Sequence, residues 1–177
     1  MPARIRVEDR ECPLSTAMSY VSEWWTVLIL HDCFDGYSRF DQFQANIGLS
    51  SSMLTTRLKT LVDNGILTRR AYQQHPTRHE YVLTDLGRSL RPILVAMAAW
   101  RNEQLPQDER AMILVDAETG REVEPAVIDP ESGLSVSDPR FVFTAGPAAG
   151  HQMRARYSRQ DQSEGAGATR ARESAAR

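Results

Sequence analysis

One stretch of the sequence, residues 38–84, constrains the fold of this chain more than any other. The stretch begins with apolar side chains at the spacing of one helix face, which predicts a first helix. This helix is expected to end at Gly48, because glycine readily adopts the left-handed conformation that closes a helix. The apolar positions are Phe40, Phe43 and Ile47, and the expected N-cap is Ser38. Residues 50–64 predict a second helix, whose cap and stop signals are Ser50 or Ser51 and Asn64-Gly65. Two helices joined by a short turn are typical of a helix-turn-helix.

The second helix has one apolar side and one side rich in hydroxyl groups. At the helical period its apolar side chains fall within roughly a quarter of a turn, and they are Leu54, Leu58, Leu61 and Val62. Burying each contributes about 1.5–3 kcal/mol, which is enough to fix the side that faces inward. The outward side and its flanks include Ser51, Ser52, Thr55, Thr56, Arg57 and Lys59. Short hydroxyl side chains followed by a basic residue suit the major groove of DNA, although an ordinary surface helix can have the same composition.

A β-hairpin is expected after the second helix. Residues 66–72 and 79–84 are rich in β-branched and aromatic residues without a helical period, and the turn between them is built on Pro76. Basic side chains gather here, namely Arg69, Arg70 and Arg78. Residues 38–91 hold eight Arg/Lys against four Asp/Glu, whereas the whole chain has a formal net charge of −2. Positive charge therefore collects where a DNA backbone would be met, with solvated hairpin arginines as the plainer alternative.

Many ordered positions in this region share the pattern of one family. They are Trp25-Thr26, Leu28-Ile29-Leu30, Arg39-Phe40-Asp41, Leu54, Arg57-Leu58, Leu61, Gly65, Arg69, Tyr72, Pro76, Arg78, Glu80-Tyr81, Leu83-Thr84 and Gly87. Over roughly residues 11–101 the chain thereby resembles the HxlR-type transcriptional regulators, MarR-like winged-helix proteins of bacteria. The resemblance implies a homodimer that binds double-stranded DNA. One departure is Ser22-Glu23-Trp24, where the family usually has a Gly-rich, basic turn.

The rest of the composition excludes several classes of protein. The four histidines lack metal-ligand spacing, and we find no catalytic Ser/His/Asp order, phosphate-binding glycine loop or paired carboxylates. We therefore expect neither an enzyme nor a bound metal or cofactor. No apolar run approaches the roughly 18 residues of a membrane helix, and no basic-then-apolar segment leads the chain. We expect a cytoplasmic bacterial protein that associates with the nucleoid when it is bound to DNA.

Three further helices are expected around the helix-turn-helix. One begins near Pro13, a second is nearly all apolar over about residues 25–34, and a third follows a Thr cap and spans about 84–104 with a bend at Pro92. The apolar stripe of the third is wider than one small core covers, and the resemblance implies dimerisation through this helix and the first. The expected interface residues are Leu14, Met18, Leu90, Leu94, Met97 and Trp100. The alternative is that residues 106–145 cover the stripe within one chain.

The two cysteines have different expected roles. Cys12 lies where many HxlR-type proteins carry a cysteine, which in several of them senses oxidants or electrophiles. Its acidic neighbours would raise the pKa of the thiol, whereas the start of a helix would lower it. A redox sensor and a non-sensing thiol therefore both stay open. Cys33 lies on the nearly all-apolar helix and is expected to be a small core residue.

The composition changes after Leu105-Pro106. Three short strands with turn signals between them suggest a small antiparallel β appendage, with the strands at Met112–Val115, Glu122–Ile128 and Arg140–Thr144. Residues 106–150 hold three Arg against nine Asp/Glu, so this part should avoid DNA. Its expected role is a ligand pocket, an added dimer contact or a cover for apolar surface. The following residues, up to 177, have almost no large apolar side chains and are expected to be disordered.

These observations predict a mainly α winged helix-turn-helix protein with four parts. The parts are a flexible arm (1–11), a DNA-binding and dimerisation domain (12–105), a β-rich appendage (106–149) and a disordered tail (150–177). We expect a repressor whose recognition helix, about 50–64, lies in the major groove of an inverted repeat, with the wing, 73–78, on the backbone or in the minor groove. A small-molecule or oxidant effector, or thiol modification, would relieve it. The alternatives are a winged-helix module that binds protein instead of DNA and, for Arg57, a purely structural role.

Overall fold

The computed structural model describes residues 11–21 and 23–158. By internal contacts the chain divides into two units, Tyr20–Ser135 and a second made of the residues on either side of it. Helix α1 (Pro13–Val21) crosses the boundary between the units. The first unit contains α2 (Trp24–Phe34), α3 (Phe40–Ile47), α4 (Ser51–Asp63), β1 (Leu67–Gln74), β2 (Thr77–Leu83), α5 (Asp85–Arg88), α6 (Arg91–Glu103) and the 3-10 turn η2 (Gln107–Glu109).

Helices α3 and α4 form the predicted helix-turn-helix. Gly48 closes α3 in the left-handed region (φ 75°), and the Ser50 hydroxyl caps α4 by accepting the Met53 N–H at 3.4 Å. The predicted cap of α3 is wrong, because Arg39 occupies that position and its N–H donates to the Gln42 side chain at 3.0 Å. The Ser38 hydroxyl instead donates to a carboxylate of β2. Both helix ends that form the turn are therefore fixed by local hydrogen bonds.

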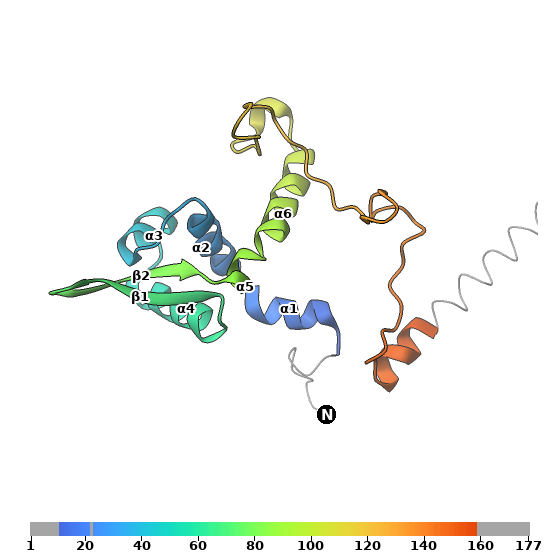
Figure 1. The fold of residues 1–177 in the computed structure, drawn as a ribbon, viewed down its shortest axis with the longest axis horizontal. Helices are drawn as coiled ribbons and strands as arrows, with labels where there is room; N and C mark the ends of the chain where they lie inside the picture. Colours follow the sequence, from blue (N-terminus) through green and yellow to red (C-terminus); the bar gives the residue numbers. More distant parts are fainter. Residues whose placement is uncertain (1–10, 22, 159–177) are drawn as a thin grey trace, which may run out of the picture. The chain divides into compact units, whose positions relative to one another are not determined.

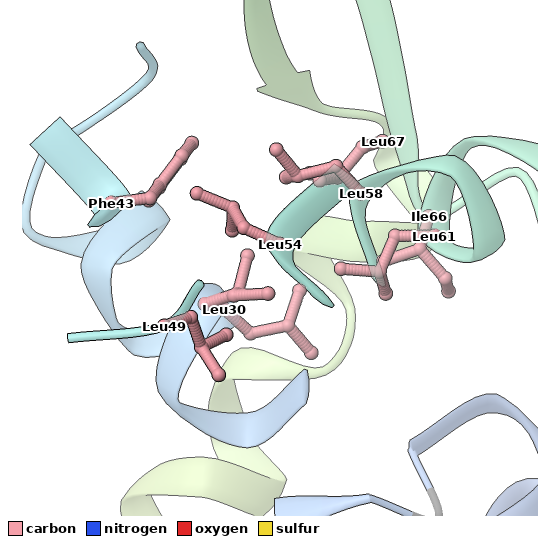
Figure 2. Close-up of a cluster of buried hydrophobic side chains, with 9 residues drawn as sticks. Leu30, Phe43, Leu49, Leu54, Leu58, Leu61, Ile66 and Leu67 are labelled. Atoms are coloured by element: carbon pink, nitrogen blue, oxygen red, sulfur yellow. The ribbon is translucent and has the colours of Figure 1, made fainter. Parts of the chain in front are cut away.

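The core lies where α2, α3, α4 and the start of β1 meet (Figure 2). The three leucines of the predicted inward side of α4 are buried, and Val62 packs at the margin of the cluster. Ile29 and Leu30 have no solvent exposure, which confirms that the nearly all-apolar α2 belongs in the core. The fully buried residues of the cluster also include Phe43, Ile66 and Leu67, all at 2% exposure or less. Their burial fixes the side of α4 that stays outside.

The hairpin is longer than the sequence predicts. Strands β1 and β2 pair antiparallel from Leu67 opposite Leu83 to Gln74 opposite Thr77, with an irregularity between Ala71 and Gln73. The pairing extends into the expected turn and shortens it to two residues. The tip of the hairpin projects beyond the helices of the unit, as a wing does (Figure 1). The mainly helical winged helix-turn-helix fold is thereby confirmed.

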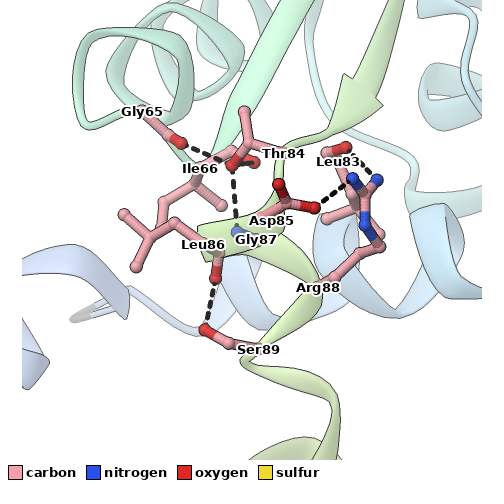
Figure 3. Close-up of polar contacts among 9 residues, drawn as sticks. All are labelled: Gly65, Ile66, Leu83, Thr84, Asp85, Leu86, Gly87, Arg88 and Ser89. Atoms are coloured by element: carbon pink, nitrogen blue, oxygen red, sulfur yellow. Dashed lines mark hydrogen bonds and ion pairs between the residues drawn. The ribbon is translucent and has the colours of Figure 1, made fainter.

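The hairpin is connected to the helices that follow by a joint, which we define as residues 83–89 with their contacts to Gly65 and Ile66 (Figure 3). The hydroxyl of Thr84 caps α5 by accepting the Gly87 N–H at 3.0 Å, and it donates to the Gly65 carbonyl at 2.6 Å. Gly87 is buried, and a Cβ built on it would lie 2.3 Å from the backbone oxygen of Ile66. The predicted cap at Thr84 is therefore confirmed, and Gly87 is required by close backbone approach.

The single bent helix expected over residues 84–104 is wrong. The chain forms two helices, α5 and α6, and Pro92 lies in the first turn of α6. Proline is tolerated there because its missing N–H has no partner in a first turn and its fixed φ suits the helix start. Pro92 therefore starts a new helix instead of bending an existing one.

The appendage lacks the three expected strands. Over the described residues after α6, antiparallel pairing is limited to two single bridges, Val115 with Glu122 and Ile128 with Ser135. Residues 140–144 are not a strand, and the Phe143 side chain is 88% exposed, so no partner strand covers it. Residues 151–158 are helical, which corrects the expected disorder there. The rest of the expected disordered tail, and most of the N-terminal arm, fall outside the described residues.

Candidate nucleic-acid interface

The outward side of α4 carries five of the residues that the sequence assigns to DNA reading. Each of them is exposed, and they are Ser51, Ser52, Thr55, Thr56 and Lys59. The hydroxyls of Thr55 and Thr56 donate to backbone carbonyls one turn earlier, at 2.7 and 3.0 Å. The outer lone pairs of these oxygens stay available, so in this conformation the threonines offer hydrogen-bond acceptors. Such a side can accept from the amino groups of adenine and cytosine in the major groove.

Arg57 differs from its neighbours on α4. Its guanidinium forms a two-pronged ion pair with Glu23, the residue that precedes α2, and its Nε is buried. This geometry supports the structural alternative, in which Arg57 ties the recognition helix to the start of α2. Glu23 was not expected in this role, and only its acidic departure from the basic turn of the family marks the position in the sequence.

Lys59 makes a weaker contact. It pairs with Asp63 one turn along α4, and both side chains are more than half exposed. Exposed pairs of this kind contribute little and exchange readily with other partners. Lys59 is therefore able to leave Asp63 for a phosphate or a base edge.

The three arginines of the wing have different surroundings. Arg70 pairs with Glu80 at 2.7 Å, and this hydrogen bond lowers the pKa of the Glu80 carboxyl. Arg69 approaches the ring of His79 at 3.0 Å. Arg78 lies in β2 near the wing tip, and its exposed side chain has no hydrogen bond or ion pair to any residue that the structure describes. The positive charge that the sequence predicts is thus partly compensated on α4 and β1 and most available at the wing tip.

The expected dimer residues differ in their burial. Leu90, which precedes α6, and Leu94 of α6 pack against the core, whereas Met97 and Trp100 are exposed, Trp100 by 66%. Leu14 and Met18 of α1 are exposed as well. The residues after α6 face a different side of this helix and contribute to a pocket with Leu94. The alternative of intrachain cover therefore accounts for one side of α6 and leaves Met97 and Trp100 uncovered in the single chain.

The two cysteines also differ. The sulfur of Cys12 receives backbone N–H groups at the start of α1, chiefly that of Ser15 and then that of Leu14, and these hydrogen bonds lower the pKa of its thiol. Cys33 packs against the core, and burial raises the pKa of its thiol to about 12. Hydrogen bonds at the start of the helix thus lower the pKa of the Cys12 thiol, while Cys33 is partly buried against the core and stays protonated.

Two further features follow from the described part of the chain. Its His, Cys, Asp and Glu side chains include no group of three or more that could hold a metal ion. No helix within residues 11–21 and 23–158 combines the length and apolar character needed to cross a bilayer.

Comparison with known proteins places the chain among regulators. The family model for HxlR-like helix-turn-helix proteins matches residues 20–109. Rv3095 of Mycobacterium tuberculosis, an uncharacterised HTH-type transcriptional regulator, is 36% identical over 132 residues, which cover 74% of this chain and 84% of Rv3095. The solved structure of PA1374 from Pseudomonas aeruginosa, a proposed transcription factor, is 37% identical with a TM-score of 0.60 and covers 82% of this chain and 99% of PA1374.

A third similar protein is a redox regulator. The oxidised form of HypR is 31% identical with a TM-score of 0.50, and the match covers 54% of this chain and 99% of HypR. The similarity is thus confined to about half of this chain, unlike that of PA1374, which extends over most of it.

Proposed function

The chain belongs to the HxlR-like helix-turn-helix family and is a DNA-binding transcriptional regulator, not an enzyme, and we propose that it acts as a homodimeric repressor on an inverted-repeat operator. Helix α4 reads the major groove through Ser51, Ser52, Thr55, Thr56 and Lys59. Arg69, Arg70 and Arg78 contact phosphates or the minor groove. Arg57 positions α4 through its pair with Glu23.

The observation that carries this proposal is the outward side of α4. Its inward leucines are fully buried, so the hydroxyl-bearing side is presented in one fixed orientation. The wing lies next in the chain and carries Arg78 exposed near its tip, where a cation can meet a phosphate. The side chains that contact bases and the arginine that contacts phosphate thus belong to the same unit of the fold.

The homodimer is proposed from the uncovered apolar side of α6. Ile93, Met97 and Trp100 recur at helical spacing and are all at least half exposed. A single chain leaves this stripe in water, and a second copy of the chain would bury it across a two-fold axis. Two copies of α4 related by such an axis would match the symmetry of an inverted repeat. Leu14 and Met18 of α1 are proposed to join this interface.

DNA binding is tested by fluorescence anisotropy with fragments from upstream of the gene of this protein, at several salt concentrations. We expect Arg78→Ala to weaken binding to all fragments and to reduce the slope of log K against log salt by about one. The matched control is Arg101→Ala, which removes an exposed arginine from α6 and should leave the slope unchanged. Absence of binding by the wild type at low salt would favour the protein-binding alternative.

Relief of repression through Cys12 is a second part of the proposal. Its lowered thiol pKa increases the fraction of nucleophilic thiolate, and the similar HypR is a redox regulator. A thiolate adds to a quinone by forming a C–S bond, while the ring takes up the proton, so no second thiol is needed. Benzoquinone should weaken DNA binding by the wild type and leave Cys12→Ser unaffected. An equal loss in both proteins would exclude Cys12.

A further inference from the structure

Helices α2 and α6 and the segment after α6 enclose a pocket that DNA binding does not use. Its volume is about 350 Å³, which lies within the range of small-molecule sites. The pocket is formed entirely by residues of the Tyr20–Ser135 unit. Its apolar walls come from all three segments and include Phe34, Leu94, Ala98, Leu114 and Val123.

Polar contacts hold the appendage in place beside the pocket. The side chain of Asn102, in the last turn of α6, donates to the Met112 carbonyl at 2.8 Å. Arg110 pairs with Glu122 at 3.3 Å, and the Val123 N–H donates to the Leu114 carbonyl at 2.8 Å. These bonds brace the two appendage segments against each other and against α6, so the cavity exists before any ligand arrives.

The lining carries more negative than positive charge. Its carboxylates are Asp35, Glu103, Glu122 and Glu124, and its arginines are Arg91 and Arg110. Arg110 and Glu122 compensate each other, which leaves Glu103, Glu124 and Asp35, the last 3.6 Å from His31, against Arg91, and no described residue forms an ion pair with Glu103 or Glu124. The last turns of α2 and α6 also contribute to the lining, and a helix C-terminus favours nearby cations. An organic cation therefore fits this pocket better than an anion does.

One donor in the lining is left without an acceptor. The Nε of Arg110 is buried and has no hydrogen-bond partner, and an unpaired buried donor is unfavourable. Because this atom has almost no accessible surface, a ligand in the pocket does not reach it, and the donor plays no part in ligand binding. The pocket thus calls for two ligand features together, which are an apolar body and a cationic amine.

We propose that this pocket binds a small aromatic amine and that the amine is an effector of the regulator; the effector role, though not the binding site, rests on the proposed function. The physical connection is α2. Its C-terminal turn lines the pocket with Phe34, while Glu23 at its other end pairs with Arg57 of the recognition helix. A ligand that shifts α2 would therefore change the presentation of α4 to DNA.

Binding is tested by calorimetry on the full chain without DNA. The probes are 5-methoxytryptamine and 5-methoxyindole-3-acetate, which share the methoxyindole ring but carry opposite charges. We expect the amine to bind at least about tenfold more tightly than the acid, and Glu103→Gln to weaken the amine by about fivefold. Ala98→Phe should fill the cavity and abolish binding. The control, Glu109→Gln, removes a carboxylate of η2 that does not line the pocket and should change nothing.

The proposed binding site would be overturned by equal binding of amine and acid, by binding of neither, or by an unaltered amine affinity in Glu103→Gln. The Glu103→Gln result tests the site even if Ala98→Phe does not fold. The effector role is tested by DNA anisotropy with and without the amine, where we expect at least a threefold change that is absent in Ala98→Phe. Binding of the amine without a change in DNA affinity would contradict that role. Failure to bind DNA without the amine would instead contradict the proposed function.

Discussion

The winged-helix body, residues 23–103, and the part of the appendage in the same unit, residues 106–135, are ordered by different forces. In the body nine apolar side chains are buried in one cluster that joins three helices and a strand. In the appendage no residue is buried, and several large apolar side chains, such as Val127 and Ile128, are about half exposed. The body is therefore held by long-range packing, whereas the appendage depends on short-range hydrogen bonds.

Two turns of the same design account for most of the order in the appendage. Asp116 accepts the Glu118 N–H at 2.9 Å, and Asp129 accepts the Ser132 N–H at 3.0 Å. Each turn ends at a glycine with φ 71°, Gly120 in the first and Gly133 in the second. Because these bonds span only a few residues, they shape each turn without linking it to a core. We therefore expect burial, more than turn chemistry, to decide which part of this chain unfolds cooperatively.

Truncation of one apolar side chain in each region should separate the two regions most clearly. We expect Leu58→Ala to lower the free energy of unfolding by about 2–5 kcal/mol, because it leaves a cavity in the core. Ile128→Ala should change it by no more than about 0.5 kcal/mol, since half of that side chain is already in water. Urea denaturation followed by circular dichroism measures both. Equal losses would mean that the appendage belongs to the cooperative core.

Glycine substitutions give a smaller but equally specific contrast. Gly87→Ala should cost about 2–3 kcal/mol, because its Cβ would meet the Ile66 carbonyl. Gly133→Ala has open space around the Cβ and only the left-handed backbone to oppose it, so we expect a loss of about 1 kcal/mol or less. Thermal unfolding of the two variants side by side checks this order. A fully stable Gly87→Ala protein would refute the close approach at the joint.

Two of the arginine–glutamate pairs, one in each region, provide a third comparison. Arg57 with Glu23 joins two helices of the body, and Arg110 with Glu122 joins two segments of the appendage. Discounted for its solvent exposure, the first pair should show a coupling energy of about 1 kcal/mol in a double-mutant cycle of global unfolding. The second pair should show a coupling near zero, because its segments can open locally. A larger coupling energy for the appendage pair than for the body pair would contradict the expectation that the appendage opens locally.

The smallest expected effect concerns pH. Asp32 is buried on α2, where Asn46 donates to one carboxylate oxygen and the other has no partner, and burial raises the pKa of this carboxyl. Because the native state binds this proton more tightly than the unfolded state, the ionised form disfavours folding at pH above the native pKa. Asp32→Asn should therefore stabilise the protein by about 1 kcal/mol at pH 7 and much less at pH 3.

The appendage supplies the control for that prediction. The Asp116 pKa is lowered, first by the Glu118 N–H, so its contribution is present above the unfolded pKa and is lost as pH falls through the native one. We therefore expect that Asp116→Asn does not stabilise the protein at either pH. Urea titrations at the two pH values measure the difference. A destabilised Asp32→Asn protein at pH 7 would show that the buried charge is favourable.

Local signals in the sequence predicted the body well. Gly48, Ser50 and the inward leucines of α4 could be located because a cap, a stop and a 3.6-residue period depend on near neighbours. The pairing of Glu23 with Arg57 could not, because it joins residues that are far apart in the chain. The appendage strands were overpredicted for a related reason, since β-branched residues form strands only when a partner strand and a core cover them.

The central claim is that the outward side of α4 reads the base sequence of DNA. Selection of binding sites from random DNA duplexes tests this claim most directly. The wild type should enrich an inverted repeat. Thr56→Ala, which removes a hydroxyl from the outward side of α4, should enrich a repeat altered or relaxed at specific base pairs, whereas Arg78→Ala should enrich the same repeat with weaker binding. No enrichment by the wild type, or one unchanged repeat from all three proteins, would contradict the assignment of α4 as the recognition helix.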